Sequence, residues 1–188
     1  ACTTSPVLGT MGVGALQTST QFTVAQMNNA WVAPAGGLVA IHRQLGSESE
    51  QIIGLVNKTT LEGDNFLWLR TRGANHNNPG RFKLDDFVAR VGGVPSPFGG
   101  LSDRDLRSGE DALGPFFWLE YRAGSQTNCV LAIRRIDGSR RILPRGTNVL
   151  EIMLRNCVQG SVEEALNPIR DSQIGVGAVG AVHSATGG

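Results

Sequence analysis

Residues 38–71, LVAIHRQLGSESEQIIGLVNKTTLEGDNFLWLRT, hold the clearest structural pattern in the chain. Three β-prone runs, at 38–43, 51–59 and 66–71, are separated by turns near Gly46 and Gly63. Short turns between such runs are typical of an antiparallel meander. In the last run Phe66 and Trp68 share one face and Leu67 and Leu69 the other, so we expect both faces of the sheet to be covered.

A second β block follows at 116–122, 129–136 and 148–155, and the dipeptide Asp137-Gly138 predicts that its last two strands form a hairpin. Apolar residues at helical spacing predict one helix over 84–91, and a capping box at 161–164 opens a second that Pro168 stops. The segment 24–34 is a candidate for another short strand, and 92–114 fits either a short helix or a loop. The sequence therefore predicts an α+β fold: an antiparallel β-sheet or sandwich of about six strands with two short helices.

Length and composition indicate one domain. A chain of 188 residues buries enough surface for a core. We expect an N-terminal tether over 1–20, a single globular α+β domain over 21–170 and a Gly/Ala-rich C-terminal tail over 171–188. The net charge of +1 gives no indication of nucleic acid as a partner. The sequence contains no run of 18 apolar residues, so it predicts no membrane-spanning helix.

Cys2 resembles the modified residue of a bacterial lipoprotein. It follows the small residue Ala1 and precedes the polar run Thr3 to Ser5, as expected after removal of a signal peptide. The alternative is that Ala1 is a cloning remnant and Cys2 an incidental thiol. We favour lipidation of Cys2, which predicts a bacterial envelope protein at the periplasmic face of the outer membrane, or a secreted one.

Cys129 and Cys157 lie on the two arms of the predicted hairpin, 28 residues apart. An odd cysteine count leaves one thiol over when the other two pair. A bridge across a loop of this size contributes about 3–4 kcal/mol in the chain-entropy model. The alternative is a pair of buried reduced thiols in a cytosolic protein. Together with Cys2, the pattern favours the disulfide and an oxidising compartment.

No motif predicts a catalytic, metal or cofactor site. The run 175–180, GVGAVG, formally matches a dinucleotide fingerprint, but only eight residues follow it and none is acidic. His42, His76 and His183 lack metal-ligand spacing, and no nucleophile elbow is present. The chain is therefore expected to be non-enzymatic, to need no cofactor and to bind no metal.

Two groups of side chains are candidates for binding. Five arginines surround the predicted hairpin turn and could hold an anionic polymer, a lipid headgroup or an acidic partner, although they could equally keep the hairpin tip soluble. Four aromatic residues could stack on sugar rings, although such residues more often belong to a core. The arginines are Arg134, Arg135, Arg140, Arg141 and Arg145, and the aromatics are Trp31, Trp68, Trp118 and Tyr121.

Three stretches carry a family resemblance. They are 33–67, with APAGG at 33–37 and GDN at 63–65; 114–136, with GPF at 114–116 and TNC at 127–129; and 152–166, with IMLRNC at 152–157. Together they resemble the BcsN family of cellulose-biosynthesis accessory proteins from alphaproteobacteria, over about two-thirds of the chain. The chain departs from that pattern at 130–132, where a more aromatic run is expected. The resemblance implies an envelope lipoprotein encoded near cellulose synthase, and it supplies no catalytic residues.

These observations predict a non-enzymatic envelope lipoprotein that assists exopolysaccharide (cellulose-like) biosynthesis, export or attachment by binding a protein or a glycan. The expected partners are an envelope protein complex or a polysaccharide, with membrane contact through the lipid anchor only and no nucleic acid. One alternative is a structural or adaptor lipoprotein of a pilus or secretion assembly. A second alternative is a small secreted hydrolase.

Overall fold

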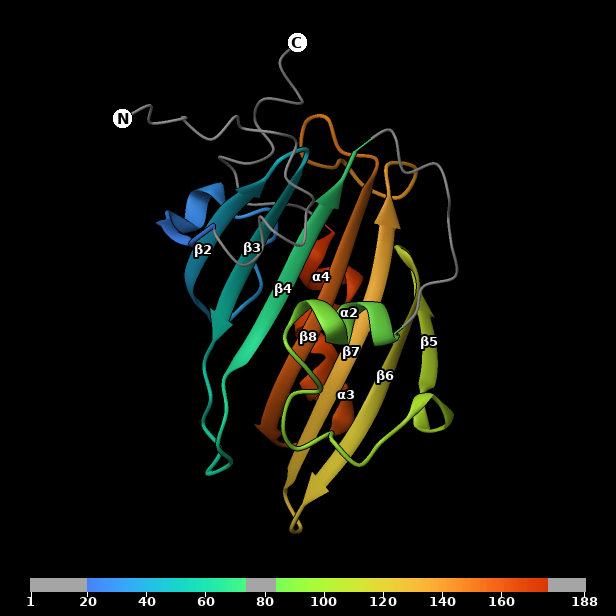
Figure 1. The fold of residues 1–188 in the computed structure, drawn as a ribbon. Helices are drawn as coiled ribbons and strands as arrows, with labels where there is room; N and C mark the ends of the chain where they lie inside the picture. Colours follow the sequence, from blue (N-terminus) through green and yellow to red (C-terminus); the bar gives the residue numbers. More distant parts are fainter. Residues whose placement is uncertain (1–19, 74–83, 176–188) are drawn as a thin grey trace, which may run out of the picture.

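The computed structural model describes residues 20–73 and 84–175, and in this part of the chain eight antiparallel strands form one open sheet (Figure 1). The strand order is β1-β2-β3-β4-β8-β7-β6-β5. The strands are β1 (Thr23–Ala25), β2 (Gly37–Leu45), β3 (Glu48–Leu55), β4 (Asn65–Arg72), β5 (Arg107–Asp111), β6 (Gly114–Ala123), β7 (Thr127–Asp137) and β8 (Val149–Gln159).

Six short helical segments accompany the sheet among the described residues. Three are α-helices: α2 (Leu84–Arg90), α3 (Val162–Leu166) and α4 (Asp171–Ile174). Three are 3-10 turns: η1 (Met27–Asn29), η2 (Asp103–Asp105) and η3 (Asn167–Ile169). No helix in this part of the chain is long and apolar enough to cross a membrane.

The α+β class and the antiparallel arrangement are confirmed, and the strand count is corrected from about six to eight. The predicted meander is β2-β3-β4, and the predicted hairpin is β7-β8. The additional strands, β1 and β5, are the two edges of the sheet, with three and five residues. Both are largely exposed, so neither shows the alternation of apolar and polar residues that marks a half-buried strand.

The back face of the sheet carries the main core. The helices α3 and α4 lie behind the strands (Figure 1), and Leu166 and Ile174 are buried there against Leu67 and Leu154. The helix α3 begins at Ser161, whose hydroxyl accepts a hydrogen bond from the Glu164 N–H at 3.2 Å, as the capping box predicts.

Among the described residues, the front face is covered over only part of its width. The helix α2 lies in front of β7 and β8 (Figure 1), and Phe87 from α2 and Phe98 from the following loop pack with Leu119, Leu131 and Met153. The loop segment 92–114, left open between helix and loop by the sequence, contains both η2 and β5. The two faces thus differ, because the back core spans the sheet from β2 to β6, while α2 covers the middle strands of the front.

The described domain extends past the expected boundary at residue 170. Residues 171–174 form α4, the Ile174 side chain is fully buried, and the Asp171 N–H donates to the Asp111 carboxylate at 3.0 Å. The expected tether and the rest of the expected tail, together with Cys2, lie outside the described residues.

Candidate functional site

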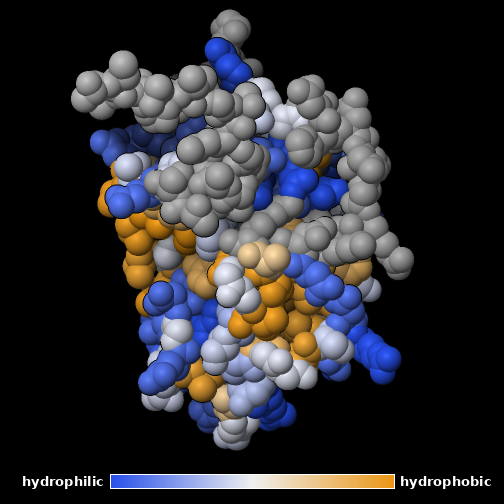
Figure 2. Space-filling view, in the orientation of Figure 1, coloured by the Kyte–Doolittle hydropathy of each residue, from blue (hydrophilic) through white to orange (hydrophobic). Residues whose placement is uncertain are grey.

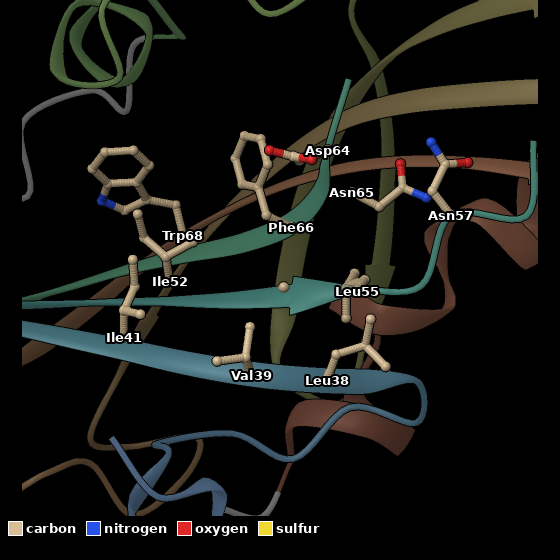
Figure 3. Close-up of a pocket in the computed structure, with 11 residues that line it drawn as sticks. Leu38, Val39, Ile41, Ile52, Leu55, Asn57, Asp64, Asn65, Phe66 and Trp68 are labelled. Carbon is tan, nitrogen blue, oxygen red and sulfur yellow. The ribbon is translucent and has the colours of Figure 1, made fainter. Parts of the chain in front are cut away.

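The front face over β2, β3 and β4 contains an apolar groove of about 530 Å³, which we call the β2–β4 groove (Figure 3). Two rows of side chains run across the strands at its floor. The register aligns Val39 with Gly54 and Gly54 with Phe66, and in the next row it aligns Ile41, Ile52 and Trp68. The full lining is Leu38, Val39, Ile41, Ile52, Gly54, Leu55, Asn57, Asp64, Asn65, Phe66 and Trp68.

Gly54 is the residue that hollows the groove. It sits between Val39 and Phe66 in the first row and leaves that position of the sheet without a side chain. A Cβ placed on Gly54 would lie 3.2 Å from Val39 Cγ1, which is a tight contact. A glycine inside a strand often marks a place where another group approaches the backbone closely.

The outer wall of the groove exposes large aliphatic side chains. Leu38 is 64% exposed and Val39 45% exposed, and Val56 and Val24 at the same edge of the sheet are also exposed. Figure 2 shows this apolar surface at the left of the front face, over β2 and β3. A contiguous exposed apolar patch of this kind marks interaction surfaces more often than a single exposed leucine does.

At the polar end of the groove, the side-chain amides of two asparagines bind backbone carbonyls of the surrounding loops and strands. The Asn57 amide donates to the carbonyls of Leu61 and Gly63, and the Asn65 amide donates to the carbonyls of Val56 and Cys157. These amide N–H groups are therefore committed to the fold. Asp64 and the indole of Trp68 are the remaining polar side chains of the lining.

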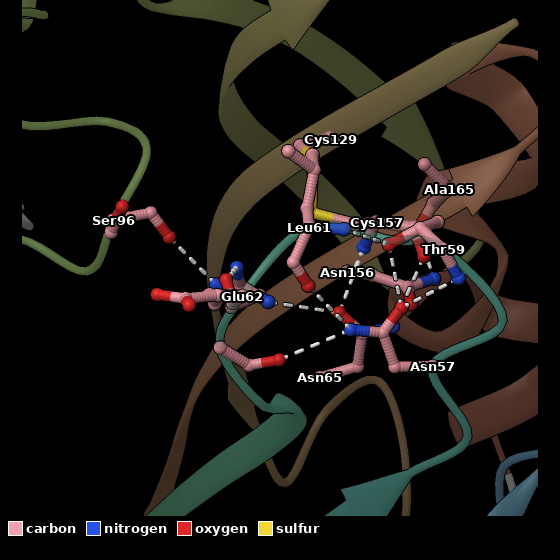
Figure 4. The surroundings of a disulfide bond; sticks show 12 residues. Asn57, Thr59, Leu61, Glu62, Asn65, Ser96, Cys129, Asn156, Cys157 and Ala165 are labelled. Carbon is pink, nitrogen blue, oxygen red and sulfur yellow. Dashed lines mark hydrogen bonds between the residues drawn. A yellow bond between two sulfur atoms is a disulfide. The ribbon is translucent and has the colours of Figure 1, made fainter. Parts of the chain in front are cut away.

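Arg155 and Cys157, both on β8, bind this polar end. Figure 4 shows Asn57 and Asn65 beside the disulfide. The Arg155 guanidinium donates to the carbonyls of Glu62, Asp64 and Ser96 and to Asn65 Oδ1, at 2.8–3.0 Å. Burial lowers the pKa of Arg155, and the nearby Asp64 carboxylate acts in the opposite direction. One buried cation thus joins the β3–β4 loop to the loop that follows α2.

The structure joins Cys129 and Cys157 by a disulfide between adjacent strands. The two residues are register partners on β7 and β8, and both are buried. This pairing agrees with the sequence prediction of a disulfide across the hairpin.

Beyond the groove, the same face carries a row of alternating charges across five strands, which we call the charged row. The register aligns Arg43 with Glu50, Glu50 with Arg70, Arg70 with Glu151, and Glu151 with Arg135. Glu50 is fully buried and receives hydrogen bonds from Arg43 Nε at 2.8 Å and Arg70 Nε at 2.7 Å. Glu151 is also buried and pairs with Arg72 and, at 3.4 Å, with Arg135.

An aromatic contact connects the groove to the charged row. The ring of Phe22 meets Trp68 edge-on, with centroids 6.0 Å apart, and the Arg43 guanidinium lies 4.2 Å from the centroid of the same Phe22 ring. Phe22 thus closes the Trp68 end of the groove, where the apolar lining gives way to charge.

The structure does not bring the five predicted arginines to one surface. Arg134 is buried on the back face, where it binds the Asp111 carboxylate at 2.7 and 3.0 Å and the Ile169 carbonyl at 2.8 Å. Burial acts to raise the pKa of Asp111, but the hydrogen bonds from Arg134, Leu113 N–H and Asp171 N–H together hold it below its ordinary value. Arg134 therefore fastens η3 to the end of β5.

The other four arginines divide between the front face and the β7–β8 loop. Arg135 belongs to the charged row, Arg140 and Arg145 are exposed on the loop, and Arg141 is buried at the back face. Arg134 and Arg135 are successive strand residues and so point to opposite faces of the sheet.

The four candidate aromatic residues also separate. Trp31 is buried in the back core, Trp118 is half-buried and packs against the same core, and Tyr121 is exposed on β6. Trp68 is half-buried and lines the groove. Trp31 and Trp118 are therefore core residues, whereas Trp68 lines the candidate site.

His42 lies on the back face of β2 with its ring edge-on to Trp31, and burial lowers its pKa. No group of three or more His, Cys, Asp or Glu side chains able to hold a metal occurs in the described part of the chain. His76, His183 and all but the first residue of 175–180 lie outside that part.

The sequence interpretation missed the groove and the charged row. The signal for the groove was present in Gly54, a glycine within a run of apolar residues. The charged row left no local signal, because its residues lie far apart in the chain and only the register brings them together.

No family model matches the chain, and neither the curated proteins nor the solved structures contain a significant match to it.

Proposed function

We propose that this protein is a non-enzymatic accessory lipoprotein of the bacterial envelope, which assists exopolysaccharide synthesis, export or attachment by docking a partner protein in the β2–β4 groove. The observation that carries the proposal is the groove itself: an open apolar trough hollowed at Gly54 and walled by exposed Leu38 and Val39. Burying such side chains against a partner contributes roughly 25 cal/mol per Å² of apolar area.

The lining favours a protein segment over a sugar chain. A glycan site combines aromatic stacking with hydrogen bonds to many hydroxyl groups. Here the amide N–H groups of Asn57 and Asn65 are already bound to backbone carbonyls, which leaves few polar groups for hydroxyls. Aliphatic side chains dominate the remaining surface, so the groove suits the apolar side chains of another protein.

The envelope location rests on two features of the chain. The disulfide between Cys129 and Cys157 is the kind of bond that persists in the periplasm or outside the cell. The junction around Cys2 and the resemblance to cellulose-biosynthesis accessory proteins support the lipid anchor and the exopolysaccharide role. Phe22, close to the first described residue, packs against Trp68 in the lining of the groove.

A pull-down from detergent extracts of the native envelope tests this function. The bait is the full-length lipidated protein, compared with Gly54→Leu, which fills the groove floor. Gly138→Leu is the matched control, because a side chain on Gly138 meets nothing within 4 Å. Near-UV circular dichroism establishes that each variant is folded.

We expect the wild type and Gly138→Leu to recover cellulose synthase subunits, and Gly54→Leu to recover at least tenfold less. Recovery of secretin or pilus components instead would support the adaptor alternative. Equal recovery by a folded Gly54→Leu variant would exclude the groove as the docking surface. Retention of the wild type on polysaccharide, lost in Gly54→Leu, would replace the protein partner by a glycan.

A further inference from the structure

Arg141 is a buried cation without a compensating anion. It lies on the β7–β8 loop with only 7% of its surface exposed, and its Nη2 donates to the Trp31 carbonyl at 2.8 Å. The Nε and Nη1 atoms of the same guanidinium are buried without a hydrogen-bond partner. Burying an unpaired charge costs several kcal/mol, so such a group calls for an explanation.

The described residues offer no carboxylate to this guanidinium. No acidic side chain of residues 20–73 and 84–175 forms a salt bridge with Arg141. The segments 1–19, 74–83 and 176–188 contain no Asp or Glu in their sequence. Three of the other buried arginines have a carboxylate, since Arg43 and Arg70 share Glu50 and Arg134 has Asp111. Arg155 has none among the described residues, but its guanidinium donates to three backbone carbonyls and to Asn65 Oδ1.

A further unsatisfied polar atom lies beside the ring of Trp31. The His42 ring stands edge-on to the Trp31 ring with centroids 5.7 Å apart, and its buried Nδ1 has no hydrogen-bond partner. Burial lowers the pKa of both His42 and Arg141, as expected for basic groups in a place that solvates charge poorly. Three buried nitrogens therefore lack partners here: Nδ1 of His42, whose ring meets the Trp31 ring, and Nε and Nη1 of Arg141, whose Nη2 binds the Trp31 carbonyl.

The loop that carries Arg141 is exposed on both sides of this residue. The residues on either side of Arg141 in the chain, Arg140 and Ile142, are exposed, and Ile142 is 51% exposed. The loop from 138 to 148 contains turns and no strand or helix. Because Nε and Nη1 are buried, an ion reaches this edge of Arg141 only when the loop rearranges.

We propose that Arg141 is the binding group of an oxyanion site at the β7–β8 loop, which takes a phosphate group either as free phosphate or on a lipid headgroup. The planar guanidinium presents N–H donors in the geometry that phosphate oxygens accept. The site lies on the opposite face of the sheet from the β2–β4 groove and is independent of the proposed docking function.

Thermal unfolding of the full-length protein in increasing inorganic phosphate tests the site, with sodium chloride of equal ionic strength as the reference. We expect the Tm of the wild type to rise saturably, by about 3–6 °C when phosphate is tenfold above its Kd. Arg141→Met is expected to lose this rise and to unfold in chloride at the wild-type Tm or above it, because it removes an unpaired buried charge. Arg140→Gln is the matched control and keeps the response.

A titration by NMR makes the test independent of variant folding. Phosphate should shift the Nε–H resonance of Arg141 in the wild type, with the same Kd as the Tm series. Absence of a saturable Tm rise in the wild type, or an equal rise in Arg141→Met, would overturn the proposal.

Vesicles distinguish the two sources of phosphate. Unlipidated protein is mixed with phosphatidylglycerol or phosphatidylcholine vesicles and sedimented. Binding to phosphatidylglycerol that Arg141→Met lowers at least fivefold, while Arg140→Gln lowers it less than twofold, indicates a headgroup site. A phosphate response without Arg141-dependent vesicle binding indicates a site for the free ion.

Discussion

The β2–β4 groove and the charged row lie side by side on the same face of the sheet. In this pair of regions apolar side chains are exposed and charged side chains are buried, which is the reverse of the usual arrangement. The groove exposes Leu38 and Val39, whereas the charged row buries Glu50 completely. Along β4 the change takes two residues, from Trp68 in the groove to Arg70 in the charged row.

The difference shows what each region is built to do. The carboxylates of the charged row have their partners within the protein, so this region can stabilise one register of five strands without any ligand. No side chain of the described residues fills the groove over Gly54, and the proposed function assigns that place to a partner. We therefore expect substitutions in the charged row to change stability and substitutions in the groove to change binding.

The largest effect is expected from Glu50→Gln. The substitution leaves Arg43 and Arg70 buried without their shared carboxylate, which costs about 3–5 kcal/mol in the free energy of unfolding. Urea denaturation followed by circular dichroism measures it. Arg107→Gln, which breaks the exposed pair with Glu120, should cost below about 1 kcal/mol. A similar loss of unfolding free energy in the two variants would mean that the buried ion pairs of the charged row contribute no more than an exposed pair.

Loss of the disulfide is expected to rank second. Replacing both Cys129 and Cys157 by serine releases a loop of 28 residues and should lower the free energy of unfolding by about 3–4 kcal/mol. Denaturation of the wild type with and without a reducing agent provides a second measurement. Alkylation of both cysteines in the native, non-reduced protein would contradict the bond itself.

The smallest effect on stability is expected in the groove wall. Leu38→Ser removes an exposed leucine and should change the free energy of unfolding by no more than about 0.5 kcal/mol, while lowering partner recovery at least fivefold. Ile142→Ser is the matched control, since Ile142 is similarly exposed but lies outside the groove. Equal recovery by the two variants would show that Leu38 has no special role.

Local patterns were enough to predict the covered parts of the fold. The alternation in 66–71, the Asp137-Gly138 turn and the capping box at Ser161 each act over a few residues, and the meander, the hairpin and α3 follow them. The edge strand β5 escaped prediction, and β1 is only the first part of the candidate strand at 24–34, because exposed strands lack alternation. The Cys129–Cys157 pair could be predicted because its two arms belong to one hairpin.

The candidate site was not predictable in the same way. The partners of Glu50 come from two other strands, and the position of Gly54 between Val39 and Phe66 depends on the register of three strands. The arginine run from 134 to 145 suggested one anionic surface, but strand alternation sends Arg134 and Arg135 to opposite faces, and the loop buries Arg141.

Photo-crosslinking in living cells tests the docking claim most directly. A photoreactive amino acid is placed at Leu38 in the groove wall and, as the reference, at Ile142. The account predicts an adduct from position 38 with a component of the exopolysaccharide machinery, absent from position 142 and lost when Gly54→Leu is added. No adduct at position 38, or the same adduct from both positions, would contradict it.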